Sequence, residues 1–275
     1  MSGKLYIVGT PIGNLGDFSP RGVETLSKVD FIAAEDTRVS VKLLNHFGIK
    51  KPLVSYFEHN KAEKGAQIIA RIAAGESCAL VTDAGMPAIS DPGEELVRDC
   101  HKAGVPVETV PGPSAVITAL AASGMVSGRF CFEGFLSVNK ISRKEHLAQL
   151  VNEPRTMIFY EAPHKLLNTL KDLYSFLGDR EIALVRELTK LHEEVVHTTL
   201  SEAATLYDEE HKPRGEYVLI IDGYDDSADS EYSFEDAVAL AKQYVSEGKS
   251  SSAAAKMASA ETGFKKGEIY KQLLI

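Results

Sequence analysis

The chain has 275 residues, 44% of them hydrophobic and 25% charged, which is typical of a soluble protein with one large core or two modest ones. Its net charge of -9 disfavours nonspecific DNA binding, so an RNA site would have to be a local basic patch. The first residues lack a signal-peptide pattern and no apolar run is long enough to span a membrane. We therefore expect a cytoplasmic protein with neither membrane nor DNA as a partner.

The three cysteines are widely spaced in the sequence. Cys78, Cys100 and Cys131 form no C-x-x-C pair, so their spacing indicates neither a disulfide framework nor a zinc site. We expect three buried thiols and no metal.

The first 113 residues alternate between short apolar segments and amphipathic ones. This pattern predicts buried parallel strands separated by helices, an α/β domain. The expected strands are Leu5–Gly9, Phe31–Ala34, Leu53–Phe57, Ala79–Thr82 and Val105–Val110.

Residues that favour helix ends stand between these strands. Ser19 before Pro20 predicts a capped helix start, and Asn60 with Glu63 three residues later predicts a capping box. The glycines of this region that predict helix ends are Gly48 and Gly75.

Five unusual loops follow the five predicted strands: "GTPIGNL", "AEDTR", "YFEHN", "TDAGMPAISDPG" and "PGPSA". In open α/β sheets ligands bind at the carboxyl ends of the strands, so the loops would share one rim. The first loop has no Gly-Lys-Ser/Thr and no G-x-G-x-x-G, which excludes a Walker loop and a dinucleotide fingerprint. A ligand held by backbone groups and apolar walls is expected instead.

Later segments predict a second α/β domain and a helical tail. "SGMVSGR" at 123–129 has the composition of a hinge, and the acidic stretch Asp222–Tyr232 that of a solvated linker. Residues 233–275 have helical spacing, with Gly263 between two short helices. The expected domains are residues 1–123, 124–224 and 233–275.

Eight motifs together resemble the tetrapyrrole-methylase-like, S-adenosylmethionine-dependent methyltransferases, and among them the branch that methylates ribosomal RNA. They run in order through nearly the whole chain, from "GTPIGNLGDFSPRGVETLSKVDFIAAEDTR" through "SYFEHN", "ALVTDAGMPAISDPGEELV", "VPGPSA", "FCFEGFL", "FYEAPHKL" and "RELTKLHEE" to "GEYVLII". The chain departs from that pattern at 137–139, where "SVN" replaces a proline and basic residues.

The resemblance implies two α/β domains with S-adenosylmethionine between them, and a homodimer. It implies methylation of a cytidine ribose 2′-hydroxyl in the decoding region of 16S rRNA, within the assembled small subunit. The cofactor positions that it implies are Pro11, Asp83, Ala84, Gly85, Ile89, Ser114, Ala115, Tyr160, Glu161, Leu188, Gly215 and Glu216.

Methyl transfer to a ribose hydroxyl requires alignment of the reactants and help with proton loss, and it needs no metal. The catalytic candidates are charged residues of two predicted loops, namely Glu35, Asp36, Arg38, Glu187 and Lys190. The first three have a structural alternative, an ion pair that caps the next helix, and Asp83 could likewise brace its own loop.

The RNA-binding candidates are Arg186, His59, Lys265 and Lys266. Each has an alternative: Arg186 lies in a mixed-charge segment typical of a solvated face, and a lone histidine is more often structural. The helical tail with its two lysines could instead cap the dimer or the second domain.

Two other functions remain open. One is methylation of a tetrapyrrole carbon, as in uroporphyrinogen or precorrin methyltransferases. The other is a small-molecule-sensing RNA-binding module without enzymatic activity.

Overall fold

The computed structural model describes residues 3–207, 212–225 and 232–274. The chain forms two compact units, a larger one of residues 1–151 and 155–222 and a smaller one of residues 152–154 and 223–275. The predicted linker Asp222–Tyr232 lies partly outside the described residues, which omit 226–231. The division into three domains stays a prediction.

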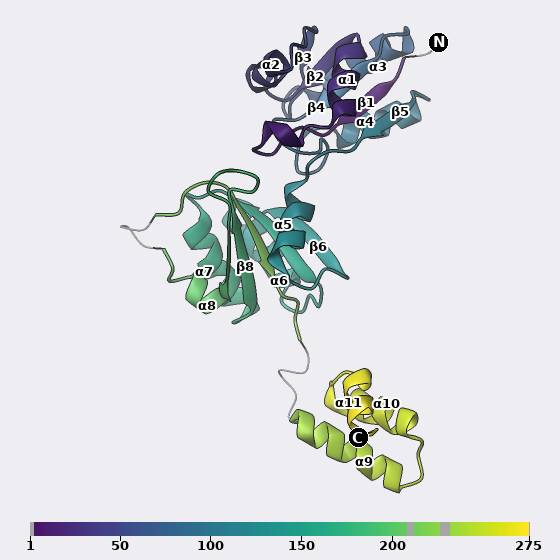
Figure 1. The fold of residues 1–275 in the computed structure, drawn as a ribbon, viewed down its shortest axis with the longest axis vertical. Helices are drawn as coiled ribbons and strands as arrows, with labels where there is room; N and C mark the ends of the chain where they lie inside the picture. The colour runs from purple at the N-terminus through teal and green to yellow at the C-terminus, as the bar shows by residue number, and fades with distance from the viewer. Residues whose placement is uncertain (1–2, 208–211, 226–231, 275) are drawn as a thin grey trace. The chain divides into compact units, whose positions relative to one another are not determined.

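The first sheet of the larger unit is parallel, with strand order β3-β2-β4-β1-β5 (Figure 1). Its strands are β1 (Leu5–Val8), β2 (Phe31–Ala34), β3 (Leu53–Ser55), β4 (Cys78–Val81) and β5 (Val107–Val110). All five strands were predicted from the sequence, with errors of no more than two residues at any end. The α/β prediction for this half is confirmed.

Four helices cover the two faces of this sheet: α1 (Pro20–Lys28), α2 (Thr37–His46), α3 (Lys61–Ala73) and α4 (Glu94–Lys102). Ile68 and Ile72 of α3 and Leu96 of α4 pack in one apolar cluster. Leu26 of α1 and Leu44 of α2 pack in another. Both faces of the sheet are therefore buried, as its almost wholly apolar strands require.

Most of the predicted helix ends are confirmed. The Ser19 hydroxyl accepts a hydrogen bond from the Gly22 amide at 3.0 Å, and Gly48 and Gly75 have positive φ beyond α2 and α3. The predicted capping box at Asn60 is wrong. Its side chain accepts from the Phe57 amide at 2.8 Å and donates to the Ser55 carbonyl at 3.1 Å, so it braces the preceding turn.

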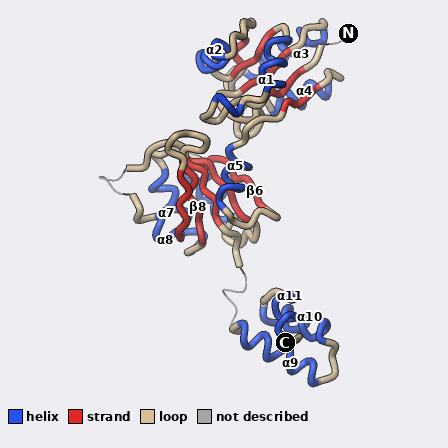
Figure 2. Tube along the Cα trace, in the orientation of Figure 1, coloured by secondary structure: helices blue, strands red, loops and turns tan. Residues whose placement is uncertain are grey.

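The second sheet has strand order β6-β7-β10-β8-β9, with β6 and β7 parallel and the other pairs antiparallel. Figure 2 shows its strands in red beside the flanking helices. The strands are β6 (Phe130–Phe135), β7 (Thr156–Glu161), β8 (Glu181–Arg186), β9 (Glu194–Thr199) and β10 (Tyr217–Ile221). The apolar cluster on one face includes residues of α6 (Lys140–Gln149), α7 (Leu166–Leu177) and α8 (Leu200–Ala203).

Helix α5 (Ala115–Ser123) connects the two sheets. It follows β5 of the first sheet, and its Val116, Ala119 and Leu120 pack against β7, β8 and β10 of the second. Its many alanines allow close approach to the strands. The loop that follows β5 therefore enters the second half of the unit directly.

The smaller unit is a bundle of three helices, α9 (Phe234–Ser246), α10 (Ser251–Thr262) and α11 (Lys266–Gln272). Ser233 and Asp236 form a capping box at the start of α9. Gly263, in the left-handed conformation at φ 81°, ends α10 as predicted. The core consists mainly of small side chains, Ala237, Ala241, Ala255 and Ala258, with Ile269.

Cys78 and Cys100 are buried, as predicted, but Cys131 is only half-buried. Among the described residues, no helix is both long and apolar enough to cross a bilayer. The same described residues contain no group of three or more histidine, cysteine, aspartate or glutamate side chains that could hold a metal ion.

The close approach of Gly9 and Gly112 predicts a large effect of Gly112→Ala. An added Cβ would lie 2.8 Å from the Cα and carbonyl carbon of Gly9, so the backbones after β1 and β5 would have to separate. We expect the free energy of unfolding to fall by about 1–3 kcal/mol, measured by urea denaturation. Gly128→Ala is the matched control, since no atom lies within 4 Å of its added Cβ. Equal stability of the two variants would contradict this account.

Candidate functional site

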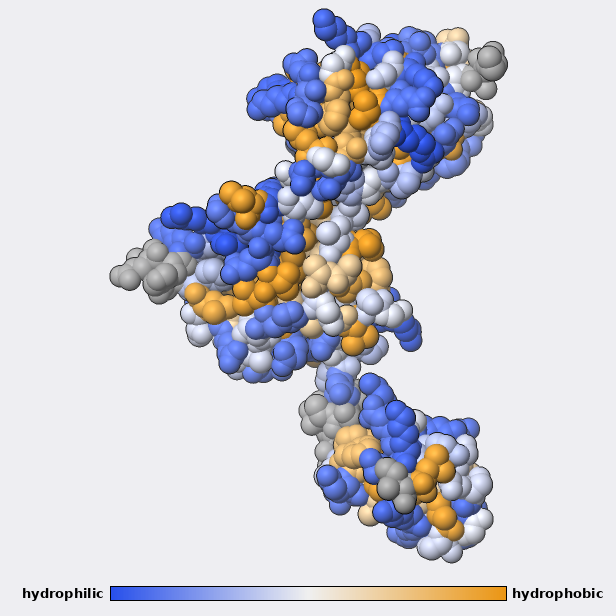
Figure 3. Space-filling view, viewed as in Figure 1, coloured by the Kyte–Doolittle hydropathy of each residue, from blue (hydrophilic) through white to orange (hydrophobic). Residues whose placement is uncertain are grey.

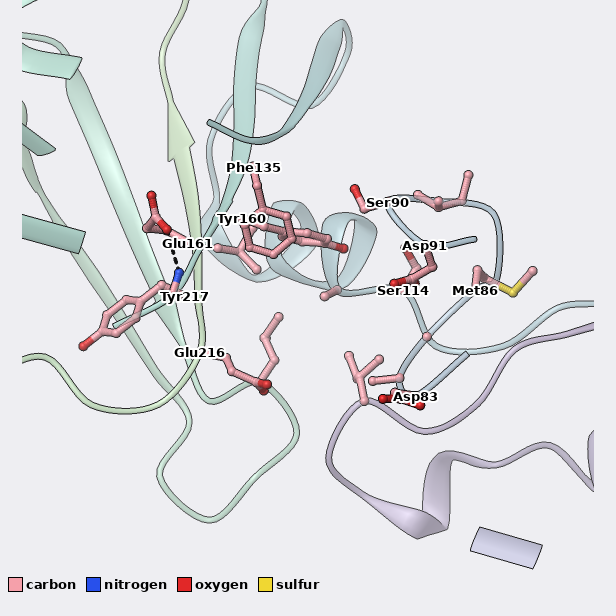
Figure 4. Close-up of a pocket in the computed structure, with 18 of the residues that line it drawn as sticks. Asp83, Met86, Ser90, Asp91, Ser114, Phe135, Tyr160, Glu161, Glu216 and Tyr217 are labelled. Carbon is pink, nitrogen blue, oxygen red and sulfur yellow. Dashed lines mark hydrogen bonds between the residues drawn. The ribbon is translucent and has the colours of Figure 1, made fainter. Parts of the chain in front are cut away.

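The larger unit contains a cavity of about 520 Å³ lined from both sheets. Figure 4 shows Asp83, Met86, Ser90, Asp91 and Ser114 on one side, facing Phe135, Tyr160, Glu161, Glu216 and Tyr217 on the other. The lining is completed by Ile12, Glu35, Ala84, Gly85, Ile89, Ala115, Ala162, Pro163, Val185, Leu188 and Val218. Such a cavity has the size typical of a small-molecule site.

The loops after β1 and β4 are joined by their backbones. The Thr10 amide donates to the Gly85 carbonyl at 2.9 Å, and the Gly85 amide to the Thr10 carbonyl at 3.1 Å. The Thr10 hydroxyl also donates to the Thr82 carbonyl at 3.2 Å. Gly85 has φ 90°, a conformation that L side chains rarely adopt, which explains the glycine in "TDAGMP".

The loop after β1 also approaches the loop after β8. A Cβ on Gly13 would lie 2.7 Å from Cγ of Lys190 and 2.8 Å from Oγ1 of Thr189. Only glycine therefore permits this approach without movement. Ile12, directly before Gly13, lines the cavity.

Two loops, one from each half, hold an apolar side chain between two strained residues. Ile89 lies between Ala88 (φ 67°) and Ser90 (φ 63°), and Leu188 lies between Glu187 (φ 52°) and Thr189 (φ 65°). Left-handed backbone in residues other than glycine costs on the order of 1 kcal/mol each and is concentrated at functional sites. Both apolar residues line the cavity, so the strained backbone lies directly beside it.

Five carboxylates line the cavity, and three of them, Glu35, Asp83 and Asp91, come from the half with the first sheet. The buried Thr82 hydroxyl donates to Glu35 at 2.7 Å and also interacts with Asp91. Desolvation and the charge of Glu35 raise the pKa of Asp91 to about 6, and desolvation raises that of Asp83. The cavity wall therefore concentrates negative charge where water is partly excluded.

Asp36 and Arg38 form an ion pair outside the cavity lining. Asp36 caps α2 by accepting from the Arg38 amide at 2.8 Å, and Nη2 of Arg38 lies 2.6 Å from its carboxylate. These bonds lower the pKa of Asp36 to about 2. The structural alternative weighed for this pair is therefore present in the fold.

Glu187 and Lys190 belong to a compact ionic network beside the cavity. Nζ of Lys190 lies 2.9 Å from Glu187 and 2.7 Å from Glu216, and the Glu216 amide donates to Glu187 at 3.0 Å. A Cβ on Gly215 would lie 2.5 Å from Cγ of Glu187. Only glycine at position 215 therefore leaves room for the Glu187 side chain.

Glu161 is a buried carboxylate with both oxygens bonded. It accepts from the Ala162 amide at 2.8 Å and from the Thr169 hydroxyl, which itself accepts from Arg143 at 2.9 Å. Burial raises the pKa of the neighbouring Tyr160 to about 12, so its hydroxyl is neutral at physiological pH.

Most of the predicted cofactor residues meet at this cavity. Ten of the twelve line it: Asp83, Ala84, Gly85, Ile89, Ser114, Ala115, Tyr160, Glu161, Leu188 and Glu216. Pro11 and Gly215 are the exceptions, each one residue from a lining position. Of the five catalytic candidates, Glu35 lines the cavity, whereas Asp36, Arg38, Glu187 and Lys190 do not.

The RNA-binding candidates lie elsewhere. Arg186 pairs with Glu194 at 3.0 Å, and the exposed His59 lies with its ring 6.1 Å from that of Phe57. Lys265 and Lys266 lie at the start of α11 in the smaller unit, where Nζ of Lys266 donates to Ser252 at 3.1 Å.

Sequence reasoning missed several lining residues, above all Asp91, Phe135 and Tyr217. Asp91 was within reach, because it lies in the loop already singled out after β4. Phe135 and Tyr217 lie at the end of β6 and the start of β10, within the motifs "FCFEGFL" and "GEYVLII", but the resemblance assigned a role to neither. Only the pairing of the second sheet brings them to the cavity.

The chain matches the family model of tetrapyrrole (corrin/porphyrin) methylases over residues 4–204. It is 46% identical over 270 residues to ribosomal RNA small subunit methyltransferase I of Synechocystis sp., covering 98% of this chain and 96% of that protein. The Bacillus subtilis protein of the same name is 44% identical over 272 residues, covering 98% and 93%.

Solved structures share the fold at lower identity. Uroporphyrin-III C-methyl transferase from Thermus thermophilus, complexed with S-adenyl homocysteine, has a TM-score of 0.57 and 20% identity, covering 80% of this chain and 97% of that one. Diphthine synthase has a TM-score of 0.60 and 15% identity, covering 79% and 89%. The chain therefore belongs to the tetrapyrrole methylase family and, within it, to the ribosomal RNA small subunit methyltransferase I group.

Proposed function

We propose that this chain transfers the methyl group of S-adenosylmethionine to the 2′-hydroxyl of a cytidine in the decoding region of 16S rRNA. The observation that carries the proposal is the 46% identity over nearly the full length to a protein named for small-subunit rRNA methylation. The cavity, lined by ten of the residues predicted to bind the cofactor, supports it. We also propose that the enzyme is a cytoplasmic homodimer that acts on the assembled small subunit.

The cavity fits S-adenosylmethionine in size and in chemistry. When bound, this sulfonium cation supplies an electrophilic methyl group. Apolar side chains such as Ile12, Ile89 and Leu188 suit its adenine and ribose, and Glu35, Asp83 and Asp91 offset its positive charge. The lysine-free first loop agrees with a ligand that carries no phosphate.

Among the catalytic candidates we assign proton acceptance to Glu35. It lines the cavity, and the Thr82 hydroxyl fixes one of its oxygens at 2.7 Å. Asp36 is a weaker base, because its bonds to Arg38 lower its pKa to about 2. Asp36 with Arg38, and Glu187 with Lys190, then position the RNA at the two sides of the cavity, while Arg186 binds phosphate.

The proposed reaction is tested by mapping the methyl group. With labelled S-adenosylmethionine and unmethylated small ribosomal subunits, we expect one label on a cytidine ribose, located by nuclease digestion and mass spectrometry. A label on a base, or transfer to a uroporphyrinogen-type substrate in place of the subunit, would refute the assignment.

The proposed role of Glu35 predicts a loss in turnover for Glu35→Gln. The substitution keeps the size of the side chain and an acceptor for Thr82 but removes the base, so kcat is expected to fall about 10²-fold to 10⁴-fold. Asp36→Asn, which keeps the helix cap, is the matched control and should lose less. Full turnover in Glu35→Gln, measured under single-turnover conditions, would exclude this role.

The raised pKa of Asp91 predicts a pH dependence of cofactor binding. Its carboxylate is ionised above about pH 6 and becomes neutral below it, so the attraction for a sulfonium cation falls as the pH falls. At pH 5 we expect S-adenosylmethionine to bind up to about tenfold more weakly than at pH 8. Calorimetric titration measures this.

S-adenosylhomocysteine, whose sulfur is neutral, is the control ligand and should show a smaller pH effect. Asp91→Asn should remove the difference between the two ligands. An unchanged difference in that variant would contradict the electrostatic role.

A further inference from the structure

The segment from Thr37 to Phe57 differs in charge from the rest of this acidic chain. It contains Arg38, Lys42, Lys50 and Lys51 but no aspartate or glutamate, in a protein of net charge -9. It comprises α2, the turn after it and the edge strand β3. A local positive region of this kind is what an acidic protein requires to meet an anionic partner.

The lysines of this segment also lack ion pairs. Residues 3–123, all described, contain eight lysines, and five of them, Lys4, Lys28, Lys61, Lys64 and Lys102, lie within 4.0 Å of a carboxylate. Lys42, Lys50 and Lys51 are the other three, and no carboxylate of the described residues pairs with them. We call these three, Lys42 on α2 and the other two in the turn that follows it, the α2 basic face. Its charge is therefore not neutralised locally.

A hollow of about 340 Å³ adjoins two of these side chains. Lys50 and Lys51 line it together with the Asn45 amide and the apolar Val41, Leu44, Ile49 and Leu53. Figure 3 shows hydrophilic residues over α2 next to an apolar strip. Cationic, amide and apolar groups around one hollow suit a phosphate with its sugar or base.

Helix α2 connects this face to the cavity. Glu35 lines the cavity, Asp36 caps the helix, and the ten residues of α2 then extend about 15 Å to its far end. The α2 basic face thus lies within the reach of a few nucleotides from the proposed site of methyl transfer.

We propose that the α2 basic face binds the phosphate backbone of the rRNA strand next to the methylated nucleotide. The inference rests on the proposed function, because that function supplies the RNA. It assigns the RNA contact to the edge of the first sheet. None of the residues predicted from the sequence to bind RNA belongs to this face. Positive charge here raises affinity for RNA without taking part in the chemical step.

The test is the double variant Lys50→Ala/Lys51→Ala with small ribosomal subunits as the probe. Loss of two phosphate contacts should raise KM and Kd for the subunit about tenfold or more, with kcat and the Kd for S-adenosylmethionine unchanged. The slope of log Kd against log salt concentration should fall by about 1.4–1.8. The control, Lys28→Ala/Lys102→Ala, makes the same change in net charge with lysines that are already ion-paired.

Three outcomes would overturn the proposal: no change in subunit binding, an equal loss in the control, or aggregation without weaker binding. The last would mean that the lysines only protect the edge strand β3. If the wild-type protein binds subunits through these lysines but methylates no ribose, the basic face stands and the proposed reaction fails. Circular dichroism checks that both variants fold.

Discussion

The packing of α5 on the second sheet is the constraint on which the cavity depends. Because Val116, Ala119 and Leu120 are buried against β7, β8 and β10, the loop after β5 is held at the second sheet. Gly112 in that loop touches Gly9 after β1, and Thr10 is paired with Gly85 after β4. One helix thereby fixes three loops of the first sheet against the second, and the cavity is what remains between them.

The sequence predicted those parts of the fold and the site that follow from a local pattern of residues. Apolar runs located all five strands of the first sheet. The rule that loops at the carboxyl ends of parallel strands meet correctly predicted that Asp83, Gly85 and Ser114 lie together. The residues taken from the second half, such as Tyr160 and Leu188, followed only from the resemblance, since their strands carry no signal of their own. In the second half, the family motifs were therefore more informative than the periodicity of apolar residues.

Competition between nearby hydrogen-bond partners, and contacts between residues distant in sequence, account for what the sequence left unresolved. Asn60 has the spacing of a capping box, yet bonds to the turn behind it are closer, and no local rule ranks these alternatives. At 137–139 the departure from the family pattern has a local explanation: Asn139 caps α6, accepting from the Ile141 amide at 2.9 Å. Asp91 lies in a loop that the sequence singled out, but its raised pKa arises from burial and from Glu35, which is distant in sequence.

The features that shape the cavity raise the free energy of the folded protein when no ligand is bound. Ala88, Ser90, Glu187 and Thr189 hold strained backbone around it, and burial of Asp91 near Glu35 disfavours ionisation. A cation in the cavity would lower the electrostatic part of this cost, whereas a neutral product would not. The clustered carboxylates therefore favour the charged methyl donor over the product, whose sulfur is neutral.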